Sequence, residues 1–441
     1  MERHLVQAPG PSKMTPEQVI SVLRLDPVAF VSDIVRSHGD IAKLPLGSQS
    51  LFILSNPEYI RQIFVVRPDI FKKRHDEAAE DAYLSQMAGF SPMFDTSLMP
   101  GYARVMSETA QRAEARWREA LPVNGTLEVD IYREMMRMGL EIVGRTLFQV
   151  DLHDESAELV DALLRLNFGY GFDPLEANLG PLMPAAERVR LTDHEAARNR
   201  VHGFMRGLFD SVADQPEEQP PLISTLLQYV GPDHAVGVAV GTMVAMHEVT
   251  VTTLAWTWYL LSQYPEVDAA LHAELSRVLG GRAATYEDLP NLAYTEMVLA
   301  EARRLYPSVW MVLRFVREDT AFDDHAVPAG SVVMASAQLM HRDPRFFPEP
   351  YRFDPLRWTQ EAGVGRPEYA YFPFSEGPRA CAGEEFAKMQ DVILLATLAQ
   401  HWRPQLVPGQ QFQPRVQKSN APRPGIRMTL QPSPLHPVPV V

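Results

Sequence analysis

The chain has 441 residues, of which 46% are hydrophobic and 22% are charged, a balance that suits a globular protein with a large core. Its formal net charge of −14 argues against nucleic acid as a partner, because phosphate binding requires a basic surface. The single cysteine excludes an internal disulfide and favours a reducing compartment.

The first half of the chain predicts a small β region followed by helices. Residues 1–11 contain no apolar segment, so we expect no membrane anchor and a cytoplasmic location. Two short strands around a turn, Asp40–Leu44 and Ser50–Leu54, predict a hairpin, and Asn56-Pro57 opens a helix that runs through Phe64. Helical periodicity then predicts four further helices, at Pro100–Leu121, Leu127–Phe148, Ser156–Gly171 and Ala185–Val212, with a Gly/Pro-rich loop at Tyr170–Pro184.

The second half begins with the longest nearly uncharged stretch, Ala235–Trp258. Its length would suit a membrane span, but Glu248 in its middle favours a long buried helix instead. Short strands are expected around Pro328-Ala-Gly330, and the remaining predicted helices are Val267–Leu279, Leu292–Leu305 and Glu384–Trp402. These elements predict a mainly α fold with a small β region.

The only cysteine, Cys381, lies in the run Phe374-Ser-Glu-Gly-Pro-Arg-Ala-Cys-Ala-Gly383. Gly377 and Gly383 allow the backbone to come close to a flat partner. Backbone N–H groups of the turn and nearby positive charge favour the thiolate over the thiol. A lone cysteine is usually a small buried hydrophobe, whereas a thiolate held in such a loop can be an axial ligand of haem iron.

The run matches the pattern Phe-x-x-Gly-x-Arg-x-Cys-x-Gly and closely resembles the haem-ligand loop of the cytochromes P-450, the haem-thiolate monooxygenases, of the soluble bacterial type. The resemblance covers nearly the whole chain. It implies one cytochrome P-450 domain over residues 1–431 and a Pro-rich tail at 432–441. Haem b would lie between the Cys loop and the long helix, with Cys381 as the iron ligand.

The resemblance also implies which other residues contact the haem. Arg379 and Arg314 match arginines that bind the propionates, and a guanidinium suits a carboxylate because it can donate two parallel hydrogen bonds. Phe374 and Gly383 belong to the same haem-binding loop. His341 is either a further polar contact of the haem or a plain turn residue.

Glu301 and Arg304 stand three residues apart on a predicted helix, so they share a face and can pair. By itself such a pair is usually exposed and contributes little stability. In the family, however, a Glu-x-x-Arg helix is locked to an arginine in a segment like Phe353–Trp358. The resemblance therefore implies a buried structural triad of Glu301, Arg304 and Arg357, although Leu356 stands where the family usually has Glu.

The long helix carries Ala245-Met-His-Glu-Val-Thr250, which is similar to the oxygen-binding segment of the family. Glu248 matches the acid that delivers protons, and we predict it to be catalytic together with Thr250. Val249 replaces the usual alcohol, and Thr250 is rotated from that position by roughly 100° of helix. Met246 replaces a small glycine, so it is expected to crowd the oxygen site or to reach the iron as a sixth ligand.

A second departure concerns the segment near residues 89–100. Family members carry a helix there with Trp and Arg that cradles the haem propionates. No Trp-x-x-x-Arg occurs between Leu84 and Pro100, so we expect this segment to be shortened. The shortening would affect haem affinity and the face that docks a redox partner.

The function implied by the resemblance is insertion of one oxygen atom from O₂ into a lipophilic small molecule, with electrons from NAD(P)H through a ferredoxin or flavodoxin and its reductase. The expected substrate pocket contains Met246, Val249, Val309 and Leu313, with loops at Leu98-Met99 and Tyr170–Pro184. Two alternatives remain open. Val249 would suit a peroxide-driven or non-oxygen-activating haem enzyme, and the shortened segment would suit a non-catalytic ligand- or partner-binding member.

Overall fold

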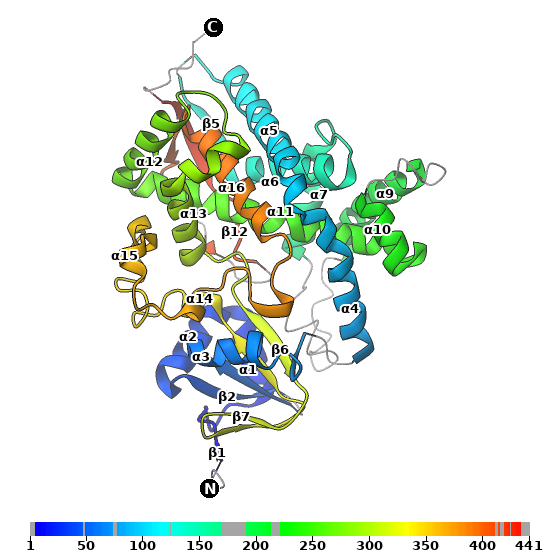
Figure 1. Ribbon diagram of the computed structural model, residues 1–441, viewed down its shortest axis with the longest axis vertical. Coiled ribbons are helices and arrows are strands. Elements are labelled where there is room, and N and C mark those ends of the chain that lie inside the picture. Colours follow the sequence, from blue (N-terminus) through cyan, green and yellow to red (C-terminus); the bar gives the residue numbers. More distant parts are fainter. Residues whose placement is uncertain are drawn as a thin grey trace.

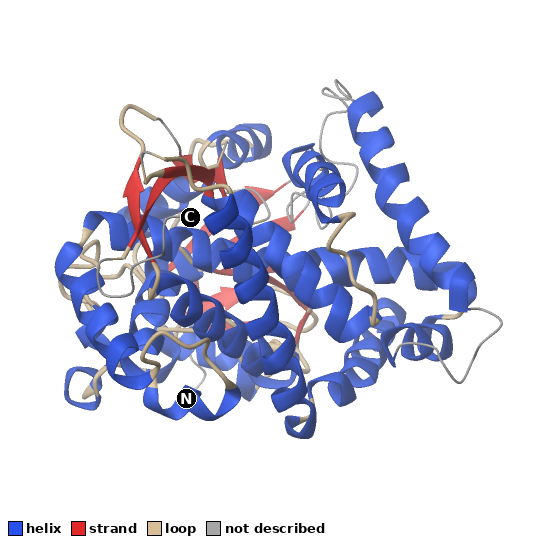
Figure 2. Cartoon of the chain, turned by 90° about the horizontal axis from the view of Figure 1, so that it is seen from above, coloured by secondary structure: helices blue, strands red, loops and turns tan. Residues whose placement is uncertain are grey.

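The computed structural model describes residues 5–46, 49–73, 77–123, 125–169, 191–212, 221–410, 413–414, 419–423 and 425–433. Helices make up most of the molecule, and the main sheet lies at the end that holds the N-terminus (Figure 1). The view from above shows the same dominance of helices, with the strands confined to small regions (Figure 2). The predicted mainly α fold with a small β region is therefore confirmed. The loop predicted at Tyr170–Pro184 and residues 434–441 of the predicted tail lie outside the described residues.

The helices predicted from the sequence occur in the predicted order. Within the described residues, the structure adds six helices that the sequence analysis did not name: α1, α2, α4, α10, α14 and α15. The first group is α1 (Pro16–Leu25), α2 (Pro27–His38), α3 (Pro57–Arg61), α4 (Glu77–Phe90), α5 (Met99–Glu119), α6 (Ile131–Val143), α7 (Ser156–Gly169), α9 (Leu191–Val212) and α10 (Pro221–Val230). The second group is α11 (Pro232–Gln263), α12 (Pro265–Val278), α13 (Ala293–Leu305), α14 (Ala337–Met340), α15 (Gln360–Gly363) and α16 (Glu384–Ala399).

Local sequence explains where the first helices begin. Thr15 caps α1 by accepting a hydrogen bond from the Gln18 N–H, and Asp26 caps α2 by accepting one from the Ala29 N–H. Asn56 caps α3 in the same way, and in all three helices a proline follows the cap. A polar cap followed by Pro satisfies a free N–H of the first turn and fixes the helical backbone angle.

The main sheet has five strands in the order β2-β3-β9-β6-β4. Its strands are β2 (Ile41–Leu46), β3 (Gln49–Leu54), β4 (Phe71–Lys72), β6 (Val312–Val316) and β9 (Val332–Ala335). Antiparallel pairing of β2 with β3, with Ile41 opposite Leu54, confirms the predicted hairpin. β3 also pairs with β9 in parallel, so the sheet joins the first hundred residues to the region after α13.

Three smaller sheets complete the β region. Their strands are β1 (Val6–Gln7), β8 (His325–Val327) and β7 (Thr320–Phe322); β10 (Trp402–Leu406), β13 (Arg427–Pro432) and β5 (Leu127–Asp130); and β11 (Gln413–Pro414) with β12 (Pro422–Arg423). β13 extends to Pro432, which pairs with Trp402, so the last strand includes the first residue of the predicted tail.

The helix expected over Leu127–Phe148 is wrong at its first end. Leu127–Asp130 form strand β5, which pairs with β13 some 300 residues later, with Leu127 opposite Leu430. Asp130 then caps α6 by accepting hydrogen bonds from the N–H groups of Tyr132 and Arg133. The last turn, Gly144–Phe148, is π-helical. A distant strand partner thus overrides the helical pattern at the first end.

The long helix α11 forms the centre of the helical region and packs against α6, α13 and α16. Its residues from Thr250 to Trp258 are buried. Contact with α6 is close, because a Cβ atom on Gly139 would lie 2.6 Å from Val251 Cγ1. Among the described residues, α11 is the one helix whose length and composition would allow it to cross a membrane, and half of its most apolar window is buried inside the protein.

The region between the β4 strand and α5 contains α4, which the sequence had not indicated. Two short 3₁₀ turns, Ser91–Phe94 and Thr96–Leu98, connect α4 to α5. Residues 91–98, all of them described, therefore hold turns in the segment that we expected to be shortened, where family members carry a haem-contact helix. α4 itself, with the sequence Glu-Ala-Ala-Glu-Asp-Ala-Tyr-Leu-Ser-Gln-Met-Ala-Gly-Phe, contains no Trp or Arg.

Candidate haem site

The Cys loop is a compact turn that ends at the start of α16. The Cys381 N–H donates to the Phe374 carbonyl at 2.9 Å, which closes the loop. Gly377 has a φ of 71°, and a Cβ atom there would lie 2.1 Å from the Phe64 carbonyl oxygen. Only glycine therefore lets the loop pack against the π-helical turn Gln62–Val66. Cys381 is an exposed residue.

The thiol of Cys381 is less acidic than the sequence suggested. Although the residue is exposed, desolvation of its sulfur raises the pKa above the ordinary value, and Glu384 acts in the same direction. The Gly383 N–H and Lys73 lower the pKa, but their effect is smaller. Within the protein alone these effects favour the thiol. Haem iron bound to Cys381 would favour the thiolate, because a coordinating metal ion deprotonates its thiol ligand.

The two arginines expected at the propionates both contact the segment from Phe64 to Pro68. Arg379 donates from Nε to Glu80 Oε1 at 2.6 Å and from Nη1 to the Pro68 carbonyl at 2.9 Å. Arg314, on β6, is buried, and its guanidinium lies 5.2 Å from the centre of the Phe64 ring. The structure thus brings both guanidinium groups close to the Cys loop, but Arg379 already holds a carboxylate from α4.

His341 holds together the chain segments that precede the Cys loop. It is fully buried, and its Nε2 accepts the Phe372 N–H at 3.0 Å. Burial, with help from Arg304 and Arg342, lowers the pKa of His341 well below its usual range, so the ring is neutral. The hydrogen-bond partner of the His341 ring is a backbone group of this segment. His341 is therefore a positioning residue.

Phe374 and Gly383 mark the two ends of the loop. The Arg303 guanidinium lies 5.7 Å from the centre of the Phe374 ring, which ties the start of the loop to α13. A Cβ atom on Gly383 would lie 3.3 Å from the ring of Phe94, in the turn after α4. The loop is therefore fixed between α13 on one side and the α4–α5 connection on the other.

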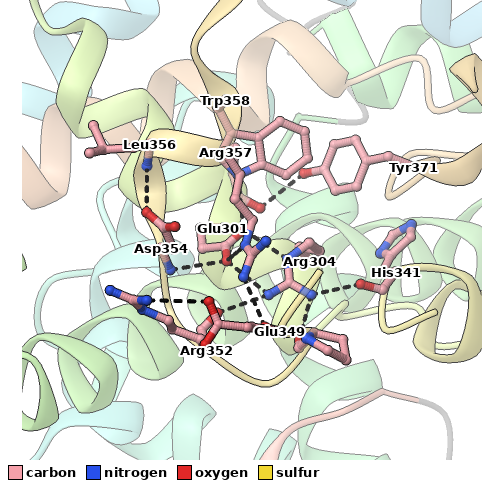
Figure 3. A network of polar contacts seen from close by, with 12 residues as sticks. Glu301, Arg304, His341, Glu349, Arg352, Asp354, Leu356, Arg357, Trp358 and Tyr371 are labelled. Atoms are coloured by element: carbon pink, nitrogen blue, oxygen red, sulfur yellow. Dashed lines mark hydrogen bonds and ion pairs between the residues drawn. The ribbon is translucent and has the colours of Figure 1, made fainter. Parts of the chain in front are cut away.

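Glu301, Arg304 and Arg357 form a buried network (Figure 3). The Glu301 carboxylate accepts from Nε and Nη2 of Arg304, each at 2.8 Å, and from Arg357 Nε at 3.2 Å. Glu301 and Arg304 have no exposed side-chain surface. The structure thus brings together the three residues that the family resemblance joins, and Leu356, where the family usually has Glu, is exposed instead.

The same network has members that sequence reasoning missed. Trp358 Nε1 donates to Glu301 Oε2 at 3.0 Å, and the Asp354 N–H donates to Oε1 at 3.1 Å. Arg304 also donates to three backbone carbonyls, those of His341, Pro350 and Arg352. These carbonyls belong to the chain that leads toward the Cys loop, so α13 holds that chain in place. The Trp after Arg357 was the available signal for the additional donor.

Glu248 and Thr250 have different partners. Glu248 is buried and accepts a hydrogen bond from the Ser419 hydroxyl. Thr250 Oγ1 donates to the His247 carbonyl at 3.1 Å and accepts from Gln390 Nε2 on α16 at 2.8 Å. Among the contacts of the described residues, the two predicted catalytic side chains thus point to separate neighbours.

A cavity of about 10 Å³ lies where α11, α13, α16 and the Cys loop meet, lined by Val249, Thr250, Thr253, Arg303, Ser308, Pro373, Phe374, Ala387 and Asp391. This volume holds about one water molecule. The Val249 carbonyl accepts a hydrogen bond from Ser308 Oγ at 2.8 Å. Polar groups therefore surround Val249 even though its own side chain carries none.

The cavity contains a buried ion pair that sequence reasoning missed. Arg303 Nη2 lies 2.9 Å from Asp391 Oδ2, and both side chains are almost fully buried. Burial raises the pKa of Asp391 to about 7, against the opposing effect of Arg303. Charged residues on the apolar faces of two predicted helices were the signal that could have identified the pair.

The predicted substrate-pocket residues are divided among different surroundings. Met246 is partly buried and packs against the main core. Leu313 is buried in a second core cluster with Met311 and Val332. Val309 is exposed. Of the four, Val249 is the one that lines the cavity beside the Cys loop.

A mainly helical fold, an exposed thiol in a glycine-bounded loop and a buried Glu–Arg–Arg network together define a haem-thiolate protein. The family model described as Cytochrome P450 matches residues 18–432, and the chain belongs to that family. It is accordingly a cytochrome P450 monooxygenase, an oxidoreductase whose cofactor is haem iron with a cysteine thiolate ligand. The sequence-based prediction of family, enzyme class and cofactor is confirmed.

Relatives with similar sequences extend along most of the chain. Cyclooctatin synthase of Streptomyces melanosporofaciens is 29% identical over 447 residues, which cover 95% of this chain and 93% of the relative. Cyclooctat-9-en-7-ol 5-monooxygenase of the same organism is 30% identical over 408 residues, or 87% of this chain and 86% of the relative. Pentalenene oxygenase of Streptomyces avermitilis is 26% identical over 416 residues, covering 88% and 89% respectively.

The residues of the site fit haem better at the iron than at the propionates. At the iron, Cys381 is exposed, sits in a closed loop and is the only cysteine of the chain. At the propionates, Arg379 donates to Glu80 and to Pro68. The thiolate ligand is thus available as the sequence predicts, whereas one expected propionate anchor has an internal partner.

Proposed function

We propose that the protein oxygenates a terpene-type lipophilic molecule, using O₂ and electrons from NAD(P)H delivered by a ferredoxin or flavodoxin and its reductase, in the cytoplasm. The observation that carries the proposal is the exposed Cys381 loop within a family match that extends from residue 18 to residue 432. The names of two relatives, which refer to pentalenene and cyclooctat-9-en-7-ol, support this substrate class.

Each part of the site has a role in this proposal. The haem, when bound to Cys381, supplies oxygen activation. Apolar side chains such as Met246 and Val249 orient the substrate. Glu248 is the proposed proton-relay residue, because it is a buried acid on α11 with a hydroxyl partner, Ser419, that can exchange a proton with it. Thr250 is the second proposed catalytic residue and is held by Gln390.

The first test is the absorption spectrum of the reduced protein exposed to carbon monoxide, compared with Cys381→Ser. A cysteine thiolate ligand would give the carbon monoxide complex a strongly red-shifted Soret band. We expect this band in the wild type and its loss in the variant, because a serine cannot supply the thiolate. A variant that keeps the red-shifted band would show that Cys381 is not the ligand.

The second test is turnover of a cyclic terpene or terpene alcohol with NADPH, ferredoxin and ferredoxin reductase. Oxygenated product that carries ¹⁸O from labelled O₂ would support the proposal. Product formed only with hydrogen peroxide would favour the peroxide-driven alternative, for which Val249 in place of an alcohol is the specific observation. In that case Val249→Thr should restore NADPH-driven turnover if a lost hydroxyl is the cause.

A further inference from the structure

A buried ion pair joins α4 to the Cys loop. The side chain of Arg379 is 6% exposed and that of Glu80 is 0% exposed, and their atoms Nε and Oε1 lie 2.6 Å apart. The second oxygen of Glu80, Oε2, accepts the Lys73 N–H at 3.0 Å. Both carboxylate oxygens are therefore engaged, and the pair is a built contact rather than a chance approach at the surface.

Arg379 is also the guanidinium next to the iron ligand, two residues before Cys381 in a short turn. Haem carries two propionate carboxylates, and a guanidinium binds carboxylates strongly through charge-assisted hydrogen bonds. In this chain, Nε of Arg379 donates to Glu80 and Nη1 donates to the Pro68 carbonyl. A propionate that reaches Arg379 must therefore displace Glu80 or lie beside it, and two carboxylates at one site repel each other.

We propose that Glu80 is an internal competitor for the haem propionate at Arg379. The Glu80 carboxylate on α4 occupies the position that a propionate would otherwise take at Arg379. This contact holds α4 in place and lowers the affinity of the chain for haem. The inference rests on the haem-thiolate assignment and not on oxygenation of any substrate. It predicts that Glu80 lowers the affinity only for porphyrins whose carboxylates are charged.

The decisive variant is Glu80→Gln, which keeps the shape of the side chain and removes its charge. Haem loss is measured as transfer to excess apomyoglobin, in the absence of substrate and reductase. We expect the variant to lose haem about tenfold more slowly than the wild type, the order of effect of one charge-assisted hydrogen bond. Thermal unfolding followed by circular dichroism shows that the variant is folded.

Glu77→Gln is the matched control. Glu77 lies on the same helix one turn earlier, is exposed and is 3.6 Å from Arg317, so its replacement changes the net charge equally without reaching the Cys loop. We expect it to leave haem loss unchanged. If Glu80→Gln fails to fold, Glu80→Asp provides the same test, because the shorter side chain withdraws the carboxylate from Arg379, and a smaller slowing is expected.

Two further arms separate competition from a general effect on the fold. In an Arg379→Gln background, Glu80→Gln should no longer slow haem loss. Haem dimethyl ester, whose propionates are uncharged, should leave wild type and Glu80→Gln at equal rates. Haem loss from Glu80→Gln that is as fast as from wild type, or faster, would overturn the proposal and make Glu80 a support for Arg379. Failure of both proteins to bind haem would overturn it as well, whereas failure of turnover alone would not affect it.

Discussion

At the scale of the residue, the Glu301 carboxylate shows why a buried charge needs all of its partners. It accepts hydrogen bonds from Arg304, Arg357, Trp358 and the Asp354 N–H, with no exposed surface of its own. Removing ions from water is costly, and this cost is offset only when good geometry satisfies every donor and acceptor. Loss of one partner of this carboxylate therefore lowers the stability of the fold by more than an average ion pair adds to it.

We accordingly expect Glu301→Gln to lower the free energy of unfolding by about 3–5 kcal/mol, because Arg304 would keep an uncompensated buried charge. Urea denaturation measures the change. Glu349→Gln is the matched control, since Glu349 pairs with Arg352 at the exposed edge of the same network (Figure 3). It should change the free energy by less than about 1 kcal/mol. Equal effects of the two substitutions would show that burial does not decide the outcome.

Asp391 predicts a pH dependence of the opposite sign to that of most carboxylates. Burial raises the pKa of Asp391 in the folded protein to about 7, well above the ordinary value of an aspartate, so the fold favours the protonated form. Stability from this group is fully present below about pH 4 and is lost as the pH rises to about 7. Relative to Asp391→Asn, the wild type should lose stability across this window, as measured by urea denaturation at each pH.

Asp288 is the natural comparison for Asp391. Hydrogen bonds from Arg282 lower the pKa of Asp288 to about 2, because the fold favours its charged form. Its contribution is present above about pH 4 and is lost as the pH falls toward 2. Relative to Asp288→Asn, the wild type should therefore gain stability as the pH rises from 2 to 4. Slopes of the same sign for both pairs would contradict the different environments of the two carboxylates.

At the scale of the element, the contact between α6 and α11 depends on the absence of a side chain. Gly139 faces Val251, and an added Cβ atom would lie 2.6 Å from its Cγ1. α6 and α11 make the most extensive helix–helix contact of the fold among the described elements. Close approach of these two helices fixes where the α11 segment with Glu248 and Thr250 lies relative to the helices around it.

Gly139→Ala should therefore destabilise the protein, although alanine favours a helix. The helical gain is about 1 kcal/mol, whereas overpacking of a core costs about 1–3 kcal/mol, so a net loss of roughly 1 kcal/mol is expected. Gly207→Ala on α9 is the control, because a Cβ atom there meets nothing within 4 Å and only the helical gain remains. Thermal melts would contradict this reasoning if Gly139→Ala were as stabilising as Gly207→Ala.

At the scale of the whole molecule, the parts that sequence predicted are those fixed by neighbouring residues. The β2–β3 hairpin, α5, α11 and α13 follow from local periodicity, and the contact of Glu301 with Arg304 follows from their spacing. Arg357 came from the family resemblance. Cys381 could be identified because its loop is a continuous run of residues.

The parts that sequence missed depend on distant partners. β5 becomes a strand because β13 pairs with it, and Glu80 meets Arg379 across 299 residues of chain. The apolar residues of α4 form no clear helical stripe, so periodicity gave no reason to expect a helix there. The pair of Arg303 and Asp391 likewise joins two helices 88 residues apart. Such contacts follow from the packing of elements and are not encoded in local spacing.

The polar contacts of α11 have a consequence for the order in which the protein is made. Glu248 is bonded to Ser419, 171 residues later, and Trp256 Nε1 donates to the Asn420 carbonyl, 164 residues later. While the ribosome is still synthesising the last quarter of the chain, the central helix has emerged without these partners. A nascent chain at this point can pack α11 against α6 but lacks the partners of Glu248 and Trp256, so the surroundings of α11 are completed only when the last segment has been synthesised.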